Sequence, residues 1–323
     1  MIFCNFVLLK RKKMKNLFIT TAFLLTALSF SQNIKFTENE LYPEGVAYSH
    51  KAKSFYVSSL HYGKIGKVDW KGNYTNFIND AESISAIGIL ADEKRNLLYV
   101  AISDPGVSVK TIAQYKIGKL AAYDLTSGER KFISDLAVIN TTGGGNFAND
   151  MTFDNDGNIY VNNSASPIIY KVSPDGKAEV FVTSDSWKGE GFNLNGIVCN
   201  QKENYLLACQ SNTGEIYKID IKTKKISKVA TDLILGADGM VLHKNELIVI
   251  SNSSKKITKL KSLDNWTTAK NEGEVISEMM FPTTGVRVNG KYYVLNAKLN
   301  EIFTPGAKLT SDFLIQEVNF DKK

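Results

Sequence analysis

The sequence contains few cysteines, three in 323 residues, and one of them, Cys4, lies close to the N-terminus. Cys199 and Cys209 flank the turn QKEN of one predicted hairpin. If that turn centres on Lys202 and Glu203, the two cysteines are several residues out of register, too far apart for a disulfide. We therefore expect two buried, unreactive thiols and a fold that does not depend on disulfides.

No long helical period occurs after the N-terminal segment, and no GxSxG motif is present. The first absence excludes an α/β architecture, and the second gives no support to a serine nucleophile on a strand-to-helix turn. The chain instead contains short runs rich in β-branched and aromatic residues, bounded by turns such as Asp156-Gly157 and Asn289-Gly290. Runs and turns of this kind predict hairpins.

A long hydrophobic run occurs only near the N-terminus. Basic residues from Lys10 to Lys15 precede an uncharged, mostly apolar segment, Leu17 to Phe30, and small residues precede Gln32. This pattern predicts a signal peptide over residues 1–31, cleaved near Ser31, and hence export. Met14 is an alternative start, and an uncleaved membrane anchor is the alternative interpretation, although 14 residues are short for a ~30 Å hydrocarbon core.

Residues 32–323, which follow the predicted signal peptide, have no large excess of charge of either sign. Residues 1–31 carry five of the 39 basic and none of the 33 acidic residues, which leaves 34 and 33 in residues 32–323. A nearly neutral body has no basic surface of the kind that binds nucleic acid or anionic membranes. We expect a small-molecule ligand and no nucleic-acid partner. The sequence does not indicate the oligomeric state.

A repeated phrase fills residues 32–323. It combines a polar or small residue, a glycine or aspartate, and two short strands joined by a tight turn. The phrases begin at Glu44, Ile87, Asn149, Asn195, Asp238 and Thr284, at intervals of 43, 62, 46, 43 and 46 residues. Periods of about 40–50 residues are typical of four-stranded propeller blades.

The predicted fold is therefore all-β, a single six-bladed β-propeller with four-stranded blades around a central axial channel. The run FLIQEVNF near the C-terminus and NIKFT near residue 34 are expected to complete the same blade, in an undecided order. The 62-residue interval places an insertion at about residues 103–118, which is either a lid over the site or a solvated loop. Trp187 and Trp266 are expected in exposed connecting loops.

The first residue of each phrase is expected to surround one mouth of the channel, with the polar ends of the second strands around it. Four of these first residues, Glu44, Asn149, Asn195 and Asp238, bear carboxylate or amide oxygens. Two carboxylates and two amides form an oxygen-only site that suits Ca²⁺ or Mg²⁺. We predict one divalent cation there, preferably Ca²⁺, with Mg²⁺, Mn²⁺ or Zn²⁺ as alternatives. The competing interpretation is that these side chains only bond the loops between blades.

An ordered quartet of motifs lies in phase with this repeat: PEG at Pro43-Glu44-Gly45, ND at Asn149-Asp150, NG at Asn195-Gly196 and DGM at Asp238-Gly239-Met240. In this respect the chain resembles the regucalcin (senescence marker protein) and gluconolactonase family over roughly residues 40–305. The resemblance implies a six-bladed propeller that hydrolyses sugar or related lactones. It also implies a metal held by Glu44, Asn195 and Asp238, with Asn149 a direct or outer ligand and Asp238 managing the attacking water.

The sequence departs from the family where substrate is bound. Phe147 stands where the family often has an arginine for substrate hydroxyls, which indicates a more apolar substrate or none. His61 and Asp104, at the ends of second strands, are further candidate substrate contacts. Three functions follow: a metal-dependent lactonase or esterase, a non-catalytic exported propeller with a structural cation, or another propeller enzyme resembling strictosidine synthase.

Overall fold

The computed structural model describes residues 32–278 and 280–320. The predicted signal peptide, residues 1–31, and the alternative start at Met14 lie outside these residues. Within them, no helix has the length and hydrophobicity needed to span a membrane.

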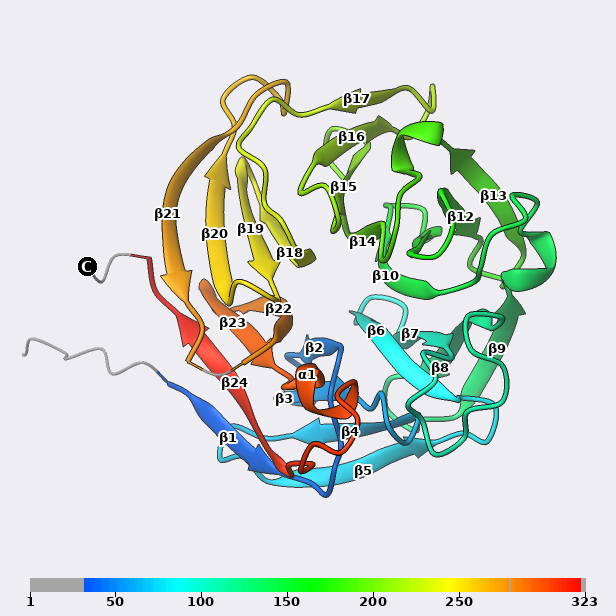
Figure 1. The fold of residues 1–323 in the computed structure, drawn as a ribbon, viewed down its shortest axis with the longest axis vertical. Coiled ribbons are helices and arrows are strands. Elements are labelled where there is room, and N and C mark those ends of the chain that lie inside the picture. The colour runs from blue at the N-terminus through cyan, green and yellow to red at the C-terminus, as the bar shows by residue number, and fades with distance from the viewer. Residues whose placement is uncertain (1–31, 279, 321–323) are drawn as a thin grey trace, which may run out of the picture. The chain divides into compact units, whose positions relative to one another are not determined.

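Six antiparallel four-stranded sheets form a ring (Figure 1), which confirms the predicted six-bladed β-propeller. The first three blades contain β2 (Val46–Ser49), β3 (Ser54–Ser58), β4 (Lys64–Val68) and β5 (Tyr74–Asn79); β6 (Ser85–Asp92), β7 (Leu97–Ser103), β8 (Gly118–Asp124) and β9 (Arg130–Asp135); and β10 (Ala148–Phe153), β11 (Ile159–Asn163), β12 (Ile168–Val172) and β13 (Ala178–Thr183). The next two contain β14 (Leu194–Asn200), β15 (Tyr205–Gln210), β16 (Ile216–Asp220) and β17 (Ile226–Lys228); and β18 (Ala237–His243), β19 (Glu246–Ser251), β20 (Lys256–Lys261) and β21 (Lys270–Ile276).

The sixth blade joins the two ends of the described chain. Its order is β22 (Pro282–Val288), β23 (Lys291–Asn296), β24 (Asp312–Val318) and β1 (Ile34–Thr37), and Phe36 pairs with Phe313. The predicted pairing of the two terminal runs is thus correct, and β1 is the outermost strand. Innermost strands contact their neighbours in chain order, and β22 contacts β2, so the ring is closed.

Burial explains the strand sequences. Every residue of the second strands β11 and β15 is buried, because each lies between two neighbouring blades and so has no solvent-facing side. The outer strand β21, KNEGEVI, is mostly exposed and correspondingly polar. Trp187 and Trp266 are both buried, so the expectation of exposed loop tryptophans is wrong. Their indole rings fill space beneath the connections and extend the apolar core.

The innermost strands begin with an irregularity that determines where the repeated residues point. The register between first and second strands shifts across Ile87-Gly88, Asn149-Asp150, Asn195-Gly196, Asp238-Gly239 and Thr283-Thr284. Such bulges redirect a side chain from the sheet face. The glycine that follows allows close approach of the next blade, since a Cβ on Gly239 would lie 2.2 Å from Thr284 Oγ1.

A long connection, residues 297–311, lies between β23 and β24 and was not anticipated from the sequence. It contains the one-turn helix α1 (Leu299–Ile302), whose Leu299 is buried. In Figure 1, α1 lies over the inner ends of β2 and β3, near the centre of the ring. This connection therefore reaches the region where the innermost strands begin.

Candidate axial site

The four predicted oxygen donors line one cavity of about 480 Å³. Glu44, Asn149, Asn195 and Asp238 are 7, 3, 5 and 5% exposed, respectively. Each comes from the start of a different innermost strand or the residues just before it. The ring thereby brings together side chains up to 194 positions apart in the sequence.

Hydrogen bonds fix the amide donors. Asn149 Nδ2 donates to Asn195 Oδ1 and to Ser164 Oγ, both at 2.9 Å. Asn162 Nδ2 donates to the main-chain oxygen of Asn195 at 2.6 Å, which holds the bulge in place. These contacts orient the amides without using every oxygen in the group.

Few hydrogen bonds hold the two acidic residues of the site, Glu44 and Asp238. Asn252 Nδ2 donates to Asp238 Oδ2 at 3.2 Å, and the Thr283 hydroxyl donates to the main-chain oxygen of Glu44 at 2.7 Å. Two buried oxygens, Glu44 Oε2 and Asn149 Oδ1, have no hydrogen-bond partner. Unpaired buried oxygens of this kind require an explanation, because leaving them unbonded costs about 1–3 kcal/mol each.

Asp150 is a third carboxylate at the axis, and the sequence analysis did not assign it to the site. Its Oδ1 would lie 2.7 Å from a Cβ on Gly88, so it occupies space that this glycine leaves free. Asp150 also stands where all five of the other phrases have glycine: Gly45, Gly88, Gly196, Gly239 and Gly285. This departure from the repeat is the sequence feature that could have identified Asp150 as a site residue.

Burial and mutual repulsion raise the pKa values of these acids. The pKa of Glu44 is raised by burial, then by Asp238 and Asp150, and that of Asp238 by burial and then by Asp150. Burial raises the pKa of Asp150 to about 7. Three acids that resist ionisation together form a site that an added positive charge would stabilise.

The donor set fits a hard cation only if amides and water take part. Among the described residues, no three His, Cys, Asp or Glu side chains converge closely enough to hold a metal by themselves. The two unpaired oxygens and the all-oxygen chemistry nevertheless suit a calcium-like ion, which accepts carboxylate, amide and water ligands. The residues present therefore fit the divalent cation that was predicted from the repeated phrases.

The metal-free protein is expected to lose stability as pH rises. Because the folded-state pKa values of Glu44, Asp150 and Asp238 are raised, the folded state binds more protons than the unfolded chain above about pH 4. The slope of stability with pH is then negative, and the part of the penalty that comes from Asp150 grows up to about pH 7. Chelator-treated protein should therefore have a higher free energy of unfolding at pH 5.5 than at pH 8, measured by urea denaturation.

Asp150→Asn is the matched variant for this experiment. It removes one of the three charges with little change of shape, so it should flatten the pH dependence and stabilise the metal-free protein at pH 8 by at least about 1 kcal/mol. Glu129→Gln, at an exposed turn on the opposite face, should leave the profile unchanged. A wild-type profile that rises between pH 5.5 and 8 would contradict the repulsion described here.

The candidate substrate contacts separate into two groups. Phe147 lines the cavity, whereas His61 and Asp104 do not. His61 Nδ1 lies 2.9 Å from the main-chain oxygen of Val107, and its ring packs against Tyr42 and Tyr62. Of the other polar strand ends, Ser211, Asn212 and Asn252 line the cavity as expected, whereas Ser103 is buried and its hydroxyl donates to the main-chain oxygen of Ala148.

Asp104 organises the inserted loop, residues 104–117. Its fully buried carboxylate accepts hydrogen bonds from the main-chain N–H groups of Gly106, Ile112 and Ala113 and from the Thr111 hydroxyl. Although burial raises the pKa of Asp104, these bonds hold it below its ordinary value. The loop is therefore a fixed wall in this structure, and it contributes Tyr115 to the cavity.

Asp104→Ala is expected to destabilise the loop by about 2–4 kcal/mol, because the loss of a charged acceptor leaves several donors unpaired. Trypsin should then cleave after Lys110 and Lys116 at least tenfold faster than in the wild type, as followed by mass spectrometry. Glu129→Gln should not change the cleavage rate. Wild-type resistance in Asp104→Ala would mean that other contacts hold the loop.

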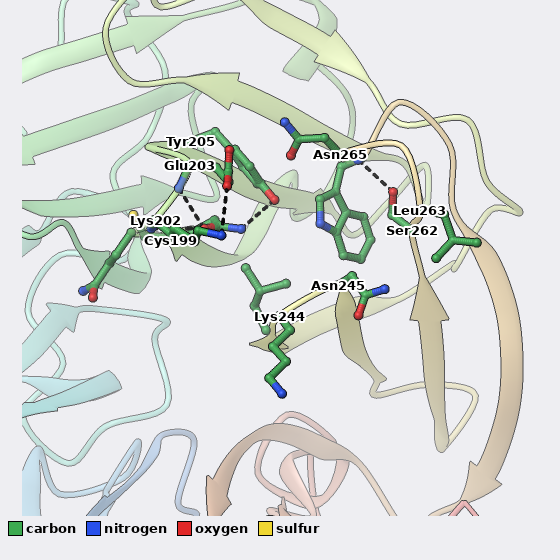
Figure 2. Close-up of a pocket in the computed structure, with 13 residues that line it drawn as sticks. Cys199, Lys202, Glu203, Tyr205, Lys244, Asn245, Ser262, Leu263 and Asn265 are labelled. Carbon is green, nitrogen blue, oxygen red and sulfur yellow. Dashed lines mark hydrogen bonds and ion pairs between the residues drawn. The ribbon is translucent and has the colours of Figure 1, made fainter.

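A hollow of larger volume, about 720 Å³, lies on the opposite face between the fourth and fifth blades. Figure 2 shows its lining, in which the Asn200 side chain bonds the backbone of Lys202 and Glu203 and the Tyr205 hydroxyl. The neighbouring Cys199 is a weak nucleophile, because burial raises the pKa of its thiol to about 12. The smaller axial cavity, which Glu44 and Asp238 line, is therefore the candidate functional site.

Cys199 and Cys209, the two cysteines among the described residues, are free as expected, but Cys199 is only partly buried, whereas both were expected to be buried. Cys199 pairs with Leu206 across the hairpin. The Cys209 thiol is buried and donates to the main-chain oxygen of Asp238 at 3.1 Å. Burial raises the pKa of this thiol above its ordinary value. Cys209 therefore helps to position the Asp238 backbone, and its thiol is a poor nucleophile.

Comparisons with known proteins identify the fold. No family model matches the sequence, and no curated protein matches it. The crystal structure of the major Malassezia sympodialis allergen Mala s 1 is similar with a TM-score of 0.72 at 17% identity, over 90% of this chain and 97% of that one. The Xanthomonas campestris gluconolactonase XC5397 gives 0.62 at 13% identity, over 90% and 91%.

A luciferin-regenerating enzyme is similar at the same level, with a TM-score of 0.61 and 13% identity over 90% of this chain and 96% of that one. At such identities a structural likeness establishes the fold and leaves the activity open. The chain is thus a six-bladed β-propeller, with an axial cavity that combines a floor of four oxygen donors with an aromatic wall.

Proposed function

We propose that this protein hydrolyses a lactone or a related ester in the axial cavity and depends on a divalent cation. One observation carries the proposal: four buried oxygen donors converge at the floor of a single open cavity, and two of their oxygens have no partner. The similarity in fold to a gluconolactonase agrees with this chemistry. Export, inferred from residues 10–31, would place the site where Ca²⁺ is plentiful.

Glu44, Asn149, Asn195 and Asp238 would hold the cation. When bound, a divalent cation supplies Lewis acidity that polarises an ester carbonyl and offsets the negative charge that develops on its oxygen. The protein then needs no oxyanion hole of backbone amides and no serine nucleophile. This agrees with the lack of a GxSxG motif.

Asp238 is the group best placed to act on water. Its carboxylate is buried, and Asn252 donates to one of its oxygens, which fixes its orientation. In this role Asp238 accepts a proton from water as the water oxygen bonds to the carbonyl carbon. The ring C–O bond then breaks, the proton passes to the leaving oxygen, and a hydroxy acid is released.

The surrounding side chains would protect this step. Phe147 is buried beside Asn149, and Leu60 and Ile87 line the same cavity. An apolar wall lowers the local dielectric and strengthens the interaction between the site's charges and a polar ester group. The cavity volume of about 480 Å³ is in the range of small-molecule sites.

The test is a panel of aldono-, aliphatic and aryl lactones, assayed with chelator-treated protein to which Ca²⁺, Mg²⁺, Mn²⁺ or Zn²⁺ is returned. Metal-dependent release of a hydroxy acid from at least one lactone is expected. Metal-saturated protein that hydrolyses none would favour the second candidate function, an exported binding module with a structural cation. Phe147 in place of an arginine is the observation that favours that second candidate.

A further inference from the structure

The upper wall of the axial cavity is aromatic. Tyr115, Phe147, Phe192, Phe281 and Phe303 all line it. They come from different connections: the inserted loop, the β9–β10, β13–β14 and β21–β22 connections, and the segment around α1. Blade packing alone does not require these rings, because four of the five retain exposed surface.

Three of these rings form one contact cluster. The centroids of Phe147 and Phe192 lie 5.1 Å apart at 81°, and Tyr115 lies 6.0 Å from Phe147 and 6.2 Å from Phe192. Both pairs that include Phe192 are edge-to-face, a favourable geometry at these distances, and the Tyr115–Phe147 pair is tilted at 51°. The cluster therefore presents a preformed apolar surface above the oxygen donors.

The mouth of the cavity is apolar as well. Phe192 is 36% exposed and Phe303 is 43% exposed, and both belong to the cavity lining. Large aromatic side chains exposed at a cavity mouth are typical of a binding surface, because a ligand that covers them removes apolar surface from water. The apolar wall thus continues from the buried floor to the solvent.

Polar side chains, among them Ser211, Asn212 and Asn252, supply the smaller part of the cavity surface, and all of its charged groups are acidic. No lysine, arginine or histidine lines the cavity among the described residues, and Glu190 adds a carboxylate near the opening to Glu44 and Asp238. An anionic ligand would meet like charges, and a polyhydroxylated ring would place hydroxyls against aromatic carbons. Each hydroxyl buried without a partner would weaken binding by roughly tenfold.

We propose that the ligand of this cavity is an uncharged aromatic or alicyclic lactone or ester, with its ring against the cluster of Tyr115, Phe147 and Phe192 and its carbonyl toward the four oxygen donors. Sugar lactones are then poor substrates. The reaction rests on the proposed hydrolytic function, whereas the ligand class rests on the wall and can be tested without turnover.

Two probes separate the ligand class from the reaction. The lactone 3,4-dihydrocoumarin and D-glucono-δ-lactone are compared as substrates of Ca²⁺-loaded protein. The lactam 3,4-dihydroquinolin-2-one, which has the same shape and resists hydrolysis, is titrated into the same protein by calorimetry. We expect at least a tenfold higher kcat/KM for dihydrocoumarin than for gluconolactone, and saturable binding of the lactam.

Phe192→Ser is the diagnostic variant, since Phe192 is partly exposed and its loss leaves the blade core intact. It should raise the dissociation constant of the lactam at least tenfold, with no change in the Ca²⁺-induced melting shift. Leu263→Ser is the matched control, because Leu263 is 87% exposed on the opposite face. It should leave both measurements unchanged.

The outcomes are distinct. Lactam binding that depends on Phe192, without hydrolysis of any lactone, would support the ligand class and overturn the hydrolytic function. Turnover of gluconolactone without lactam binding would support the function and overturn the ligand class. Lactam binding that is insensitive to Phe192→Ser would place the ligand outside this cavity and overturn the proposal, as would failure of the lactam to bind and of both lactones to react.

Discussion

Addition of Ca²⁺ to chelator-treated protein is expected to raise the free energy of unfolding by about 2.7 kcal/mol at a free concentration one hundred times the dissociation constant. For a domain of this size, that corresponds to a rise in melting temperature of roughly 5 °C. The physical reason is the cluster of acids at the axis: burial raises the pKa of Glu44 and of Asp238, the negative charge of Asp150 raises both further, and a bound cation would offset this. Calorimetry with and without Ca²⁺ measures the shift.

Glu44→Gln and Asp238→Asn should each abolish most of this shift. Both substitutions retain shape and remove a charge, so in chelator the variants should melt at or above the wild-type temperature. That second result separates a lost ligand from a damaged fold, which would melt lower. Glu129→Gln, exposed and remote, should keep the full shift. If both site variants respond to Ca²⁺ like the wild type, the cation binds elsewhere.

Loss of the Asp238 carboxylate is expected to lower lactone hydrolysis by about 10²–10⁴-fold, the range in which a positioned general base contributes. The measurement is kcat of Asp238→Asn at metal concentrations that saturate the variant, on whichever lactone the wild type hydrolyses fastest. Circular dichroism should show an unchanged β-propeller. Wild-type kcat in this variant would remove Asp238 from the reaction.

Asn252→Ala provides a finer test of the same step. Asn252 donates to Asp238 Oδ2 at 3.2 Å, so its loss frees the carboxylate to rotate without removing a charge. We expect kcat to fall roughly tenfold or more, because a hydrogen bond to a charged group is lost, while the Ca²⁺-induced melting shift persists. A loss of the melting shift together with kcat would instead assign Asn252 to the metal site.

The inserted loop, residues 104–117, contributes to the aromatic wall of the cavity. Tyr115 reaches the cavity only because Asp104 fixes the loop that carries it. Asp104 was a candidate substrate contact by its position at a strand end, yet its oxygens are occupied by loop donors. A residue can thus shape a cavity from a distance while its own side chain faces away.

The sequence alone determined the blade count, the four-stranded repeat and the positions at which oxygen donors recur. These features are encoded locally, because short strands, turns such as Asn289-Gly290 and a repeat near 45 residues each leave their pattern in consecutive positions. The convergence of Glu44, Asn149, Asn195 and Asp238 on one cavity followed, because equivalent positions of repeated blades must surround one axis.

Only the tertiary structure decided what surrounds those donors. Phe192 and Phe281 each lie three residues before a repeated phrase, but the sequence does not show that their rings meet Phe303, which follows α1; ring closure brings the three to one wall. The role of Asp150 depends on the space left by Gly88 in the neighbouring blade. The place of β1 outside β24 depends on which terminal strand pairs with β23. Each of these features depends on contacts between segments distant in sequence, whose geometry is fixed only when the six blades close.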